Sequence, residues 1–180
     1  MITGHLGIAA AVRSGWRGTS LVWLLVASVA PDILDVVMAA GRICSPYGLY
    51  SHTVPAAALM AAVLGGAALL VTGSRATAIA SALLVMLHLP PDMITGYKIF
   101  WPGGPMIGLD LYERPVLDFL VEAPVLLGGW WLLRRSGSAP RWATSAVTVI
   151  ALLVVQGAID LATGEGVKPT ACMTVPHATP

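Results

Sequence analysis

The amino-acid sequence predicts an all-α polytopic membrane protein, a bundle of about five to six helices. Hydrophobic residues make up 57% of the 180-residue chain and charged residues only 11%, with a mean hydropathy of +0.81. Soluble domains carry about 25% charged residues, so this composition is typical of a chain that lies in lipid. The tryptophans gather near the ends of the apolar runs, as interfacial anchors do.

The first two segments predict one short helix and one long helix. Residues 2–13 are apolar but reach only ~18 Å as a helix, so they cross a bilayer only partially or with help from neighbours. Residues 20–40 are long enough for a full span, which Pro31 is expected to break. The linker over 41–52 contains glycine and proline and ends at His52.

Two further long spans follow this linker. Residues 53–73 consist almost entirely of Ala, Val, Leu, Met and Gly. The Gly65-Gly66 pair in this span suits close contact between helices in lipid. After a tight turn, residues 76–94 form the next span.

The second half of the chain predicts two spans after a long connection. Residues 95–115 are rich in glycine and proline but keep apolar residues, which suggests a loop on the membrane surface. Residues 116–133 and 143–162 complete the bundle. We therefore expect a bundle domain over 1–162 and a polar tail over 163–180.

The positions of the basic residues predict how the bundle is oriented. The short turns hold more of them than the much longer segments on the other side do. Under the positive-inside rule, the turns face the cytoplasm of a bacterial-type inner membrane and the N-terminus faces out. The turns hold Arg13, Arg17, Arg75, Arg134, Arg135 and Arg141, and the outer segments hold Arg42, Lys98, Arg114 and Lys168.

Under this topology, nearly all ionisable side chains within the spans fall toward the outer, extracytoplasmic side. Scattered structural polar residues are not expected to converge in this way, and ionisable groups at membrane depth are costly. The converging residues are His5, Asp32, Asp35, His52, His88, Asp92, Asp118, Glu122 and Asp160.

The chemistry of this set points to a bound metal. His88 and Asp92 are four residues apart, so a helix places both on one face, close enough to bind one ion. Histidines and carboxylates are the ligands of zinc and similar metals. A divalent cation would also remove the repulsion between carboxylates buried together. We therefore expect a divalent metal cofactor, first of all zinc, as one or two ions.

The order of these motifs resembles the YdjM-like group of membrane-bound metal-dependent hydrolases and, more remotely, the metal core of zinc-dependent phospholipase C. The motifs are His5, Pro31-Asp32-Ile33-Leu34-Asp35, Ser51-His52-Thr53 and His88-x3-Asp92. The resemblance implies that one metal is held by Asp32, His52, His88 and Asp92. It also implies that His5, together with Asp92, holds part of a second metal.

Four residues that are not among these metal ligands are expected to act on the substrate or on the water that attacks it. Asp35 is expected to orient a ligand histidine or to take a proton from the attacking water. Glu122 lies a helical turn inside its span and is a second candidate catalytic residue. Lys98 and Arg114 lie beside the outer mouth, where a cation can bind a phosphate group, although snorkelling cations are also common there.

These expectations favour a hydrolase acting on a lipid or lipid-linked phosphoester in the membrane. Two alternatives remain open: a transporter for a cation or proton, and a non-catalytic membrane module whose metal holds the helices together. The absence of a basic stripe with interleaved aromatic residues argues against a nucleic-acid partner. Cys44 and Cys172 both fall on the outer side, where an oxidising environment would allow them to form a disulfide.

Overall fold

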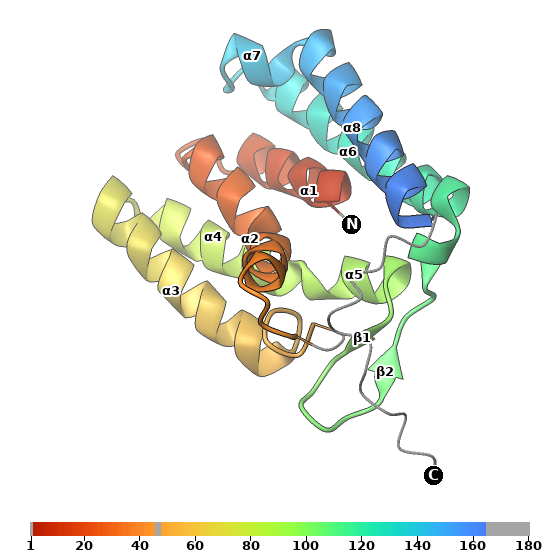
Figure 1. Cartoon of the computed structure of the whole chain (residues 1–180). Coiled ribbons are helices and arrows are strands. Elements are labelled where there is room, and N and C mark those ends of the chain that lie inside the picture. Colours follow the sequence, from red (N-terminus) through yellow and green to blue (C-terminus); the bar gives the residue numbers. More distant parts are fainter. Residues whose placement is uncertain (1, 46–47, 165–180) are drawn as a thin grey trace.

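The structure is a computed structural model, and it describes residues 2–45 and 48–164. Helices dominate it, which confirms the predicted all-α bundle (Figure 1). The helices are α1 (Ile2–Gly15), α2 (Leu21–Ala40), α3 (Val54–Thr72), α4 (Arg75–Leu87), α5 (Leu89–Thr95), α6 (Pro115–Ser136), α7 (Arg141–Thr144) and α8 (Ala146–Gly164). α8 continues through Gly164, two residues into the predicted tail. The rest of that tail begins at residue 165 and contains Cys172, the predicted partner of Cys44; it lies outside the described residues.

Pro31 does not break its helix, whereas a helix break does occur just before Pro90 and Pro91. The expected break at Pro31 is wrong, because α2 continues through this residue as one helix. A single proline removes only one backbone donor, and neighbouring groups can compensate for that loss. The predicted span over 76–94 is instead divided at His88, between α4 and α5. Pro90 and Pro91 together remove two consecutive donors, and the helix restarts just before them.

The long connection over 95–115 contains structure that the sequence did not indicate. Strands β1 (Lys98–Ile99) and β2 (Met106–Ile107) pair antiparallel, with Lys98 opposite Ile107. The backbone N–H of Val54 donates to the carbonyl of Phe100 at 3.0 Å. This bond ties the hairpin to the start of α3, so the connection is fixed over the end of the bundle.

Four helical segments in the described part of the chain are long and apolar enough to cross a membrane. They are Leu21–Ala40, Val54–Thr72, Arg75–Thr95 and Pro115–Ser136. Large apolar side chains cover their outer faces; Leu70 of α3, for example, is 86% exposed. Such faces are typical of helices that contact lipid. The apolar stretch of α8 over Ala146–Leu161 is shorter.

Helix α1 lies between two groups of helices (Figure 1). On one side it packs against α6, which in turn packs against α8; on the other side it packs against α2. α4 packs against both α2 and α3, whereas α3 and α2 share only a small contact. α3 is therefore held mainly through α4.

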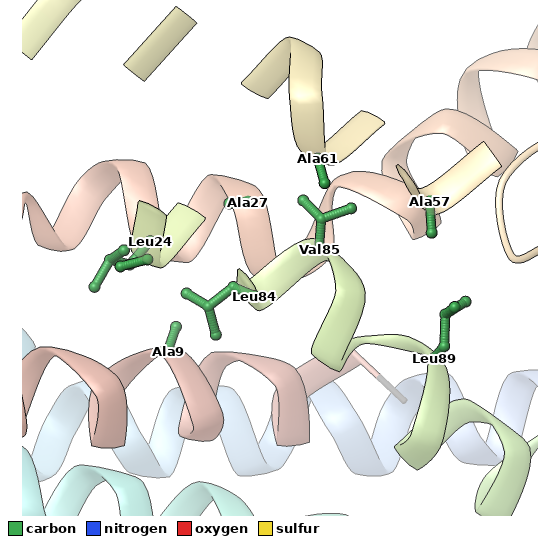
Figure 2. Close-up of a cluster of buried hydrophobic side chains, with 9 residues drawn as sticks. Ala9, Leu24, Ala27, Ala57, Ala61, Leu84, Val85 and Leu89 are labelled. Carbon is green, nitrogen blue, oxygen red and sulfur yellow. The ribbon is translucent and has the colours of Figure 1, made fainter. Parts of the chain in front are cut away.

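Small residues allow these helices to approach closely. The core between α1, α2, α3 and α4 contains several alanines, among them Ala9, Ala27, Ala57 and Ala61, which pack around a few leucines and valines (Figure 2). Such contacts let backbones come together in lipid, where no hydrophobic force drives helix association. Of the predicted glycine pair, Gly65 lies against Ala78 and Ala82 of α4. A side chain added at Gly66 would meet no atom of the described residues within 4 Å.

The short turns meet at one end of the bundle. Arg13 near the end of α1 donates to the carbonyl of Ser138, in the turn after α6, at 2.8 Å. The backbone N–H of Ser20 before α2 donates to Thr77 Oγ1 in the first turn of α4 at 3.1 Å. The arginine-rich turns are thus neighbours, and the helices that leave them carry the ionisable residues toward the opposite end.

Candidate metal centre

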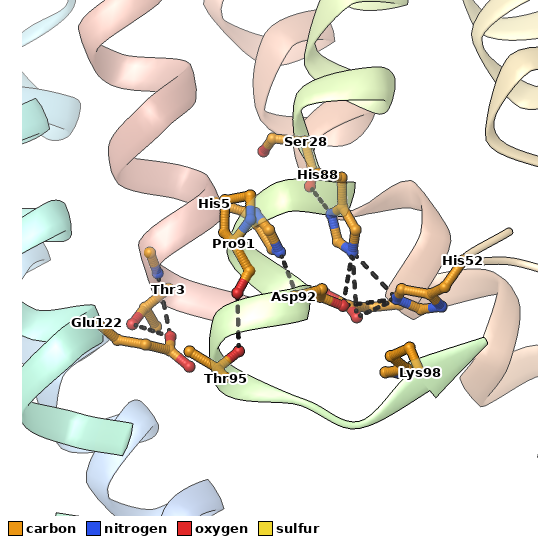
Figure 3. A network of polar contacts seen from close by, with 12 residues as sticks. Thr3, His5, Ser28, His52, His88, Pro91, Asp92, Thr95, Lys98 and Glu122 are labelled. Carbon is orange, nitrogen blue, oxygen red and sulfur yellow. Dashed lines mark hydrogen bonds and ion pairs between the residues drawn. The ribbon is translucent and has the colours of Figure 1, made fainter. Parts of the chain in front are cut away.

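Four ionisable side chains from distant parts of the chain meet beside the β1–β2 hairpin (Figure 3). Asp32 comes from α2, His52 from the residue pair before α3, His88 from the junction of α4 and α5, and Asp92 from α5. One ligand atom from each lies within 4.8 Å of every other. His52, His88 and Asp92 are no more than 2% exposed. The cluster could therefore hold a metal ion.

The separations between these ligand atoms fit a small tetrahedral ion. His52 Nε2 lies 2.8 Å from Asp92 Oδ2, 3.4 Å from Asp32 Oδ1 and 3.2 Å from His88 Nε2. His88 Nε2 lies 3.4 Å from Asp92 Oδ2 and 3.6 Å from Asp32 Oδ1. Ligands at ~2.0 Å from a tetrahedral centre are ~3.3 Å from one another, close to the middle of these values.

A further observation fits an ion at this position. Asp32 Oδ2 is buried and has no hydrogen-bond partner among residues 2–45 and 48–164. A buried carboxylate without a full set of donors is costly. Oδ1 of the same carboxylate faces His52 and His88, so a cation bound there would neutralise the Asp32 side chain as a whole. Two imidazole nitrogens and two carboxylate oxygens also form a donor set that zinc accepts.

Nδ1 of His88, the ring nitrogen that faces away from the cluster, is held by a backbone carbonyl. His88 Nδ1 lies 2.8 Å from the carbonyl oxygen of Ser28 in α2. A carbonyl can only accept, so Nδ1 carries the proton and donates it. The lone pair of Nε2 is then directed at Asp32 and Asp92. Such an outer bond is the usual way in which a protein orients a metal-binding histidine.

His52 has an equivalent outer partner formed by Ser51 and Asp35. His52 Nδ1 lies 2.7 Å from Ser51 Oγ and 3.2 Å from Asp35 Oδ2. Ser51 Oγ donates in turn to Asp35 Oδ1. His52 Nδ1 therefore acts as a donor, and Nε2 faces the cluster. This arrangement places Asp35 behind a ligand histidine, where it can orient the ring.

Charge around His52 changes its affinity for protons. Burial lowers the pKa of His52, but hydrogen bonds with Asp32, Asp35 and Asp92 outweigh burial and raise that pKa from 6.5 to about 10. In the metal-free protein, the surrounding carboxylates thus favour a cation at this position. A proton on His52 and a metal ion compete for the same nitrogen.

His5 lies on the other side of Asp92. Its Nε2 is 2.9 Å from Asp92 Oδ1, and its ring stacks on the His88 ring with centroids 3.6 Å apart. The structure therefore places His5 next to the cluster and against the second oxygen of Asp92. The ligand role for a second metal stays a prediction, whereas the contact seen is one that orients Asp92.

Both predicted phosphate-binding residues lie on the loop side of the bundle, but in different settings. Lys98 of β1 is mostly buried, and its Nζ is 3.9 Å from Asp35 Oδ2. Arg114 is exposed immediately before α6. Asp32 and Asp35 have side chains 17% and 29% exposed, so the cluster is most accessible on this side. A role in phosphate binding stays a prediction for both cations.

Glu122 belongs to a second group of carboxylates between α6 and α8. It lies with Asp118 and Asp160, and one oxygen from each is within 4.8 Å of the others. The backbone N–H of Gly4 donates to Glu122 Oε2 at 3.2 Å, and Thr3 Oγ1 donates to the same oxygen at 3.3 Å. The structure thus places Glu122 with this group, and its catalytic role stays a prediction.

Sequence reasoning did not identify the polar partners of this second group. Thr3 Oγ1 also lies 2.9 Å from Gln156 Oε1, and Gln156 Nε2 donates to Asp160 Oδ1. A signal was present in the sequence, because Gln156 and Asp160 are four residues apart in an apolar helix. The first turns of α1 therefore touch both groups, through Thr3 and Gly4 on one and His5 on the other.

Comparisons of the chain with protein-family models, with curated proteins and with solved structures found no match in any of the three. The resemblance to membrane-bound metal-dependent hydrolases therefore stays a prediction from the motifs. The geometry of the four-residue cluster is the observation on which a functional proposal must rest.

The contact behind His52 gives a first prediction. Asp35→Asn should weaken zinc binding by ~10–100-fold without abolishing it, because Asp35 positions His52 and supplies negative charge near the ion. Competition with a chromogenic chelator measures this affinity. Asp110→Asn is the matched control: Asp110 is in a left-handed turn that asparagine tolerates. Equal affinity in wild type and Asp35→Asn would show that the contact does not act on the metal.

Proposed function

We propose that this protein is an integral membrane, metal-dependent hydrolase that cleaves a lipid or lipid-linked phosphoester. The observation that carries the proposal is the meeting of two imidazole nitrogens and two carboxylate oxygens at separations that suit one zinc ion. When bound, a divalent ion supplies Lewis-acid chemistry: it lowers the pKa of water and neutralises charge on phosphoryl oxygens.

Residues of the chain would perform the remaining tasks. Asp35 is next to His52 and partly exposed, so it can hold the His52 ring and exchange a proton with water at Oδ2. Lys98 Nζ lies near that same oxygen and brings a positive charge to the open side of the site. A phosphoester that enters from this side would meet the cation before it meets the ligand residues.

The donor types favour hydrolysis over a purely structural metal. Structural zinc sites are typically built from cysteines, alone or with histidine, whereas a catalytic zinc ion also binds water. Four protein ligands fill a tetrahedral ion, so catalysis here requires a fifth position for water, and catalytic zinc can expand to five ligands. This cluster has carboxylate and histidine donors, and Asp32 lies at its partly exposed edge. Carboxylate and histidine ligands are typical of catalytic zinc sites.

A membrane location is part of the proposal. Four apolar helices long enough to span and exposed apolar faces support it. The arginine-rich turns lie together at the end away from the cluster, which under the positive-inside rule supports an extracytoplasmic site in a bacterial-type inner membrane. The substrate would then be a lipid of the outer leaflet.

The direct test is a hydrolysis screen on the protein in lipid nanodiscs. Zinc-loaded protein should release phosphate or a phosphorylated headgroup from at least one phospholipid or isoprenoid phosphate, and the chelated protein should not. Asp92→Asn should abolish this release, and Asp110→Asn should retain it. Zinc-loaded protein that hydrolyses none of these esters, or that hydrolyses them equally after Asp92→Asn, would contradict the proposal.

Proton competition gives a second prediction. Because the pKa of His52 is raised to about 10, a proton must leave this residue when zinc binds at neutral pH. Zinc affinity should therefore rise with pH up to about pH 10 and fall as the solution is acidified. Calorimetry in buffers of different ionisation enthalpy counts the protons released. Binding without proton release would show that zinc does not displace the His52 proton.

A further inference from the structure

A long apolar groove runs between α2 and α3 and has a volume of about 780 Å³. Ile33 and Val37 line it from α2, and Leu59 and Val63 line it from α3. None of its lining residues is charged. Leu59, Val63 and Val37 are 60% exposed or more, so they face whatever fills the groove.

The packing of the bundle explains why the groove exists. α3 packs along α4, and its contact with α2 is small. The facing surfaces of α2 and α3 are therefore not packed closely against each other. The side chains left on their facing surfaces are aliphatic, so the groove suits a hydrocarbon chain.

The groove is lined by chain neighbours of two cluster residues. Thr53, the neighbour of His52, lines it, as do Ile33 and Leu34, which follow Asp32. From Thr53 to Val63 the groove follows α3 for ~15 Å, at 1.5 Å per residue. This length is ~half the ~30 Å thickness of the hydrocarbon core, as one leaflet would require.

We propose that the α2–α3 groove binds the hydrocarbon chain of the substrate while its phosphoryl group lies at the Asp32–His52–His88–Asp92 cluster. This inference rests on the proposed function. It assigns a binding place to the hydrocarbon chain, the part of the substrate that the metal centre does not touch. The ligand residues, with Lys98 near Asp35, form a charged site, and the groove lined by Thr53, the neighbour of His52, is uncharged. A phosphate ester of a long alkyl or isoprenoid chain has the same division into a charged head and an apolar tail.

Photolabelling in phosphatidylcholine nanodiscs tests this assignment. The probe is dodecyl phosphate that carries a diazirine at the end of its chain, and the matched probe is the corresponding alcohol. Zinc-loaded protein should show several-fold more phosphate-probe labelling at the far end of the groove, around Val26 and Val63, than around Leu70, which is outside it. The alcohol should label both places equally.

A pair of variants on one helix provides the control. Leu59→Trp fills the groove and should lower phosphate-probe labelling of Val63 several-fold. Leu70→Trp adds the same side chain to a more exposed position of α3 outside the groove and should leave this labelling unchanged. Both variants should bind as much zinc as wild type, because neither residue belongs to the cluster.

The outcomes separate this inference from the function on which it rests. Equal labelling by phosphate and alcohol, or equal effects of the two tryptophan variants, would mean that only ordinary bilayer lipid occupies the groove, and would overturn the inference. That result leaves the proposed function intact if zinc-loaded protein still cleaves a phosphoester. Protein that binds no zinc contradicts the proposed function, whatever the labelling pattern.

Discussion

Replacing His88 with alanine is expected to abolish zinc binding and, with it, phosphoester hydrolysis. His88 Nε2 lies within 3.6 Å of ligand atoms from Asp32, His52 and Asp92. Its removal leaves only two carboxylates and one imidazole as protein donors. The loss of affinity should exceed the ~10–100-fold that removal of an outer partner costs. Elemental analysis after dialysis against a weak chelator measures the loss.

A control on the same helix separates loss of the ligand from loss of the fold. Ser81 of α4 is fully buried, and its hydroxyl has no hydrogen-bond partner among the described residues. Ser81→Ala should therefore keep both zinc and activity. His88→Ala protein must also elute as a single species from a sizing column, because His88 also bonds to Ser28. Folded His88→Ala protein that retains its zinc would show that the metal is bound elsewhere.

Replacing Gly129 with alanine is expected to have the largest effect on stability. A Cβ atom at this position of α6 would lie 1.9 Å from the carbonyl oxygen of Gly7 in α1. Real atoms do not approach so closely, so α1 and α6 must move apart. Overpacking of this kind costs ~1–3 kcal/mol, and more where backbone is in the way. Thermal unfolding followed by tryptophan fluorescence, in one detergent throughout, gives the change.

Gly128 provides a matched control at the next position of the same helix. A Cβ there meets no atom of the described residues within 4 Å. Gly128→Ala should be neutral or stabilising, because alanine favours a helix over glycine by ~1 kcal/mol. Gly129→Ala should also weaken zinc binding, since α1 carries the His5 that bonds to Asp92. Equal melting temperatures for the two variants would mean that α1 and α6 do not cross at Gly7 and Gly129.

The fold class and the gathering of ionisable residues at one end of the bundle could be predicted from the sequence. Long apolar runs indicate spans, and the position of a residue along its run gives its depth. The i,i+4 spacing of His88 and Asp92 also predicts a shared face, which survives the helix break between them because Asp92 N–H still bonds to the carbonyl of His88 at 3.4 Å. These inferences need only the rise and the period of a helix.

The sequence does not indicate which carboxylates join the histidines and which form the separate Asp118–Glu122–Asp160 group. Asp92 and Glu122 are both buried toward the same end of the bundle, yet Asp92 meets His52 and His88, whereas Glu122 meets Asp118 and Asp160. The difference depends on which neighbour each helix face contacts. Contacts such as that of Gly7 with Gly129 set this rotation, and they involve residues far apart in sequence. The β1–β2 hairpin depends on similarly long-range contacts.

X-ray absorption at the zinc edge tests the central claim most directly. Protein purified without added metal, then loaded with one equivalent of zinc, should show only nitrogen and oxygen neighbours at ~2.0–2.1 Å, with the outer-ring scattering of two imidazoles. His52→Ala and His88→Ala should each remove one imidazole contribution. A spectrum with sulfur neighbours, or with only water oxygens and no imidazole, would contradict the assignment of Asp32, His52, His88 and Asp92 as the metal centre.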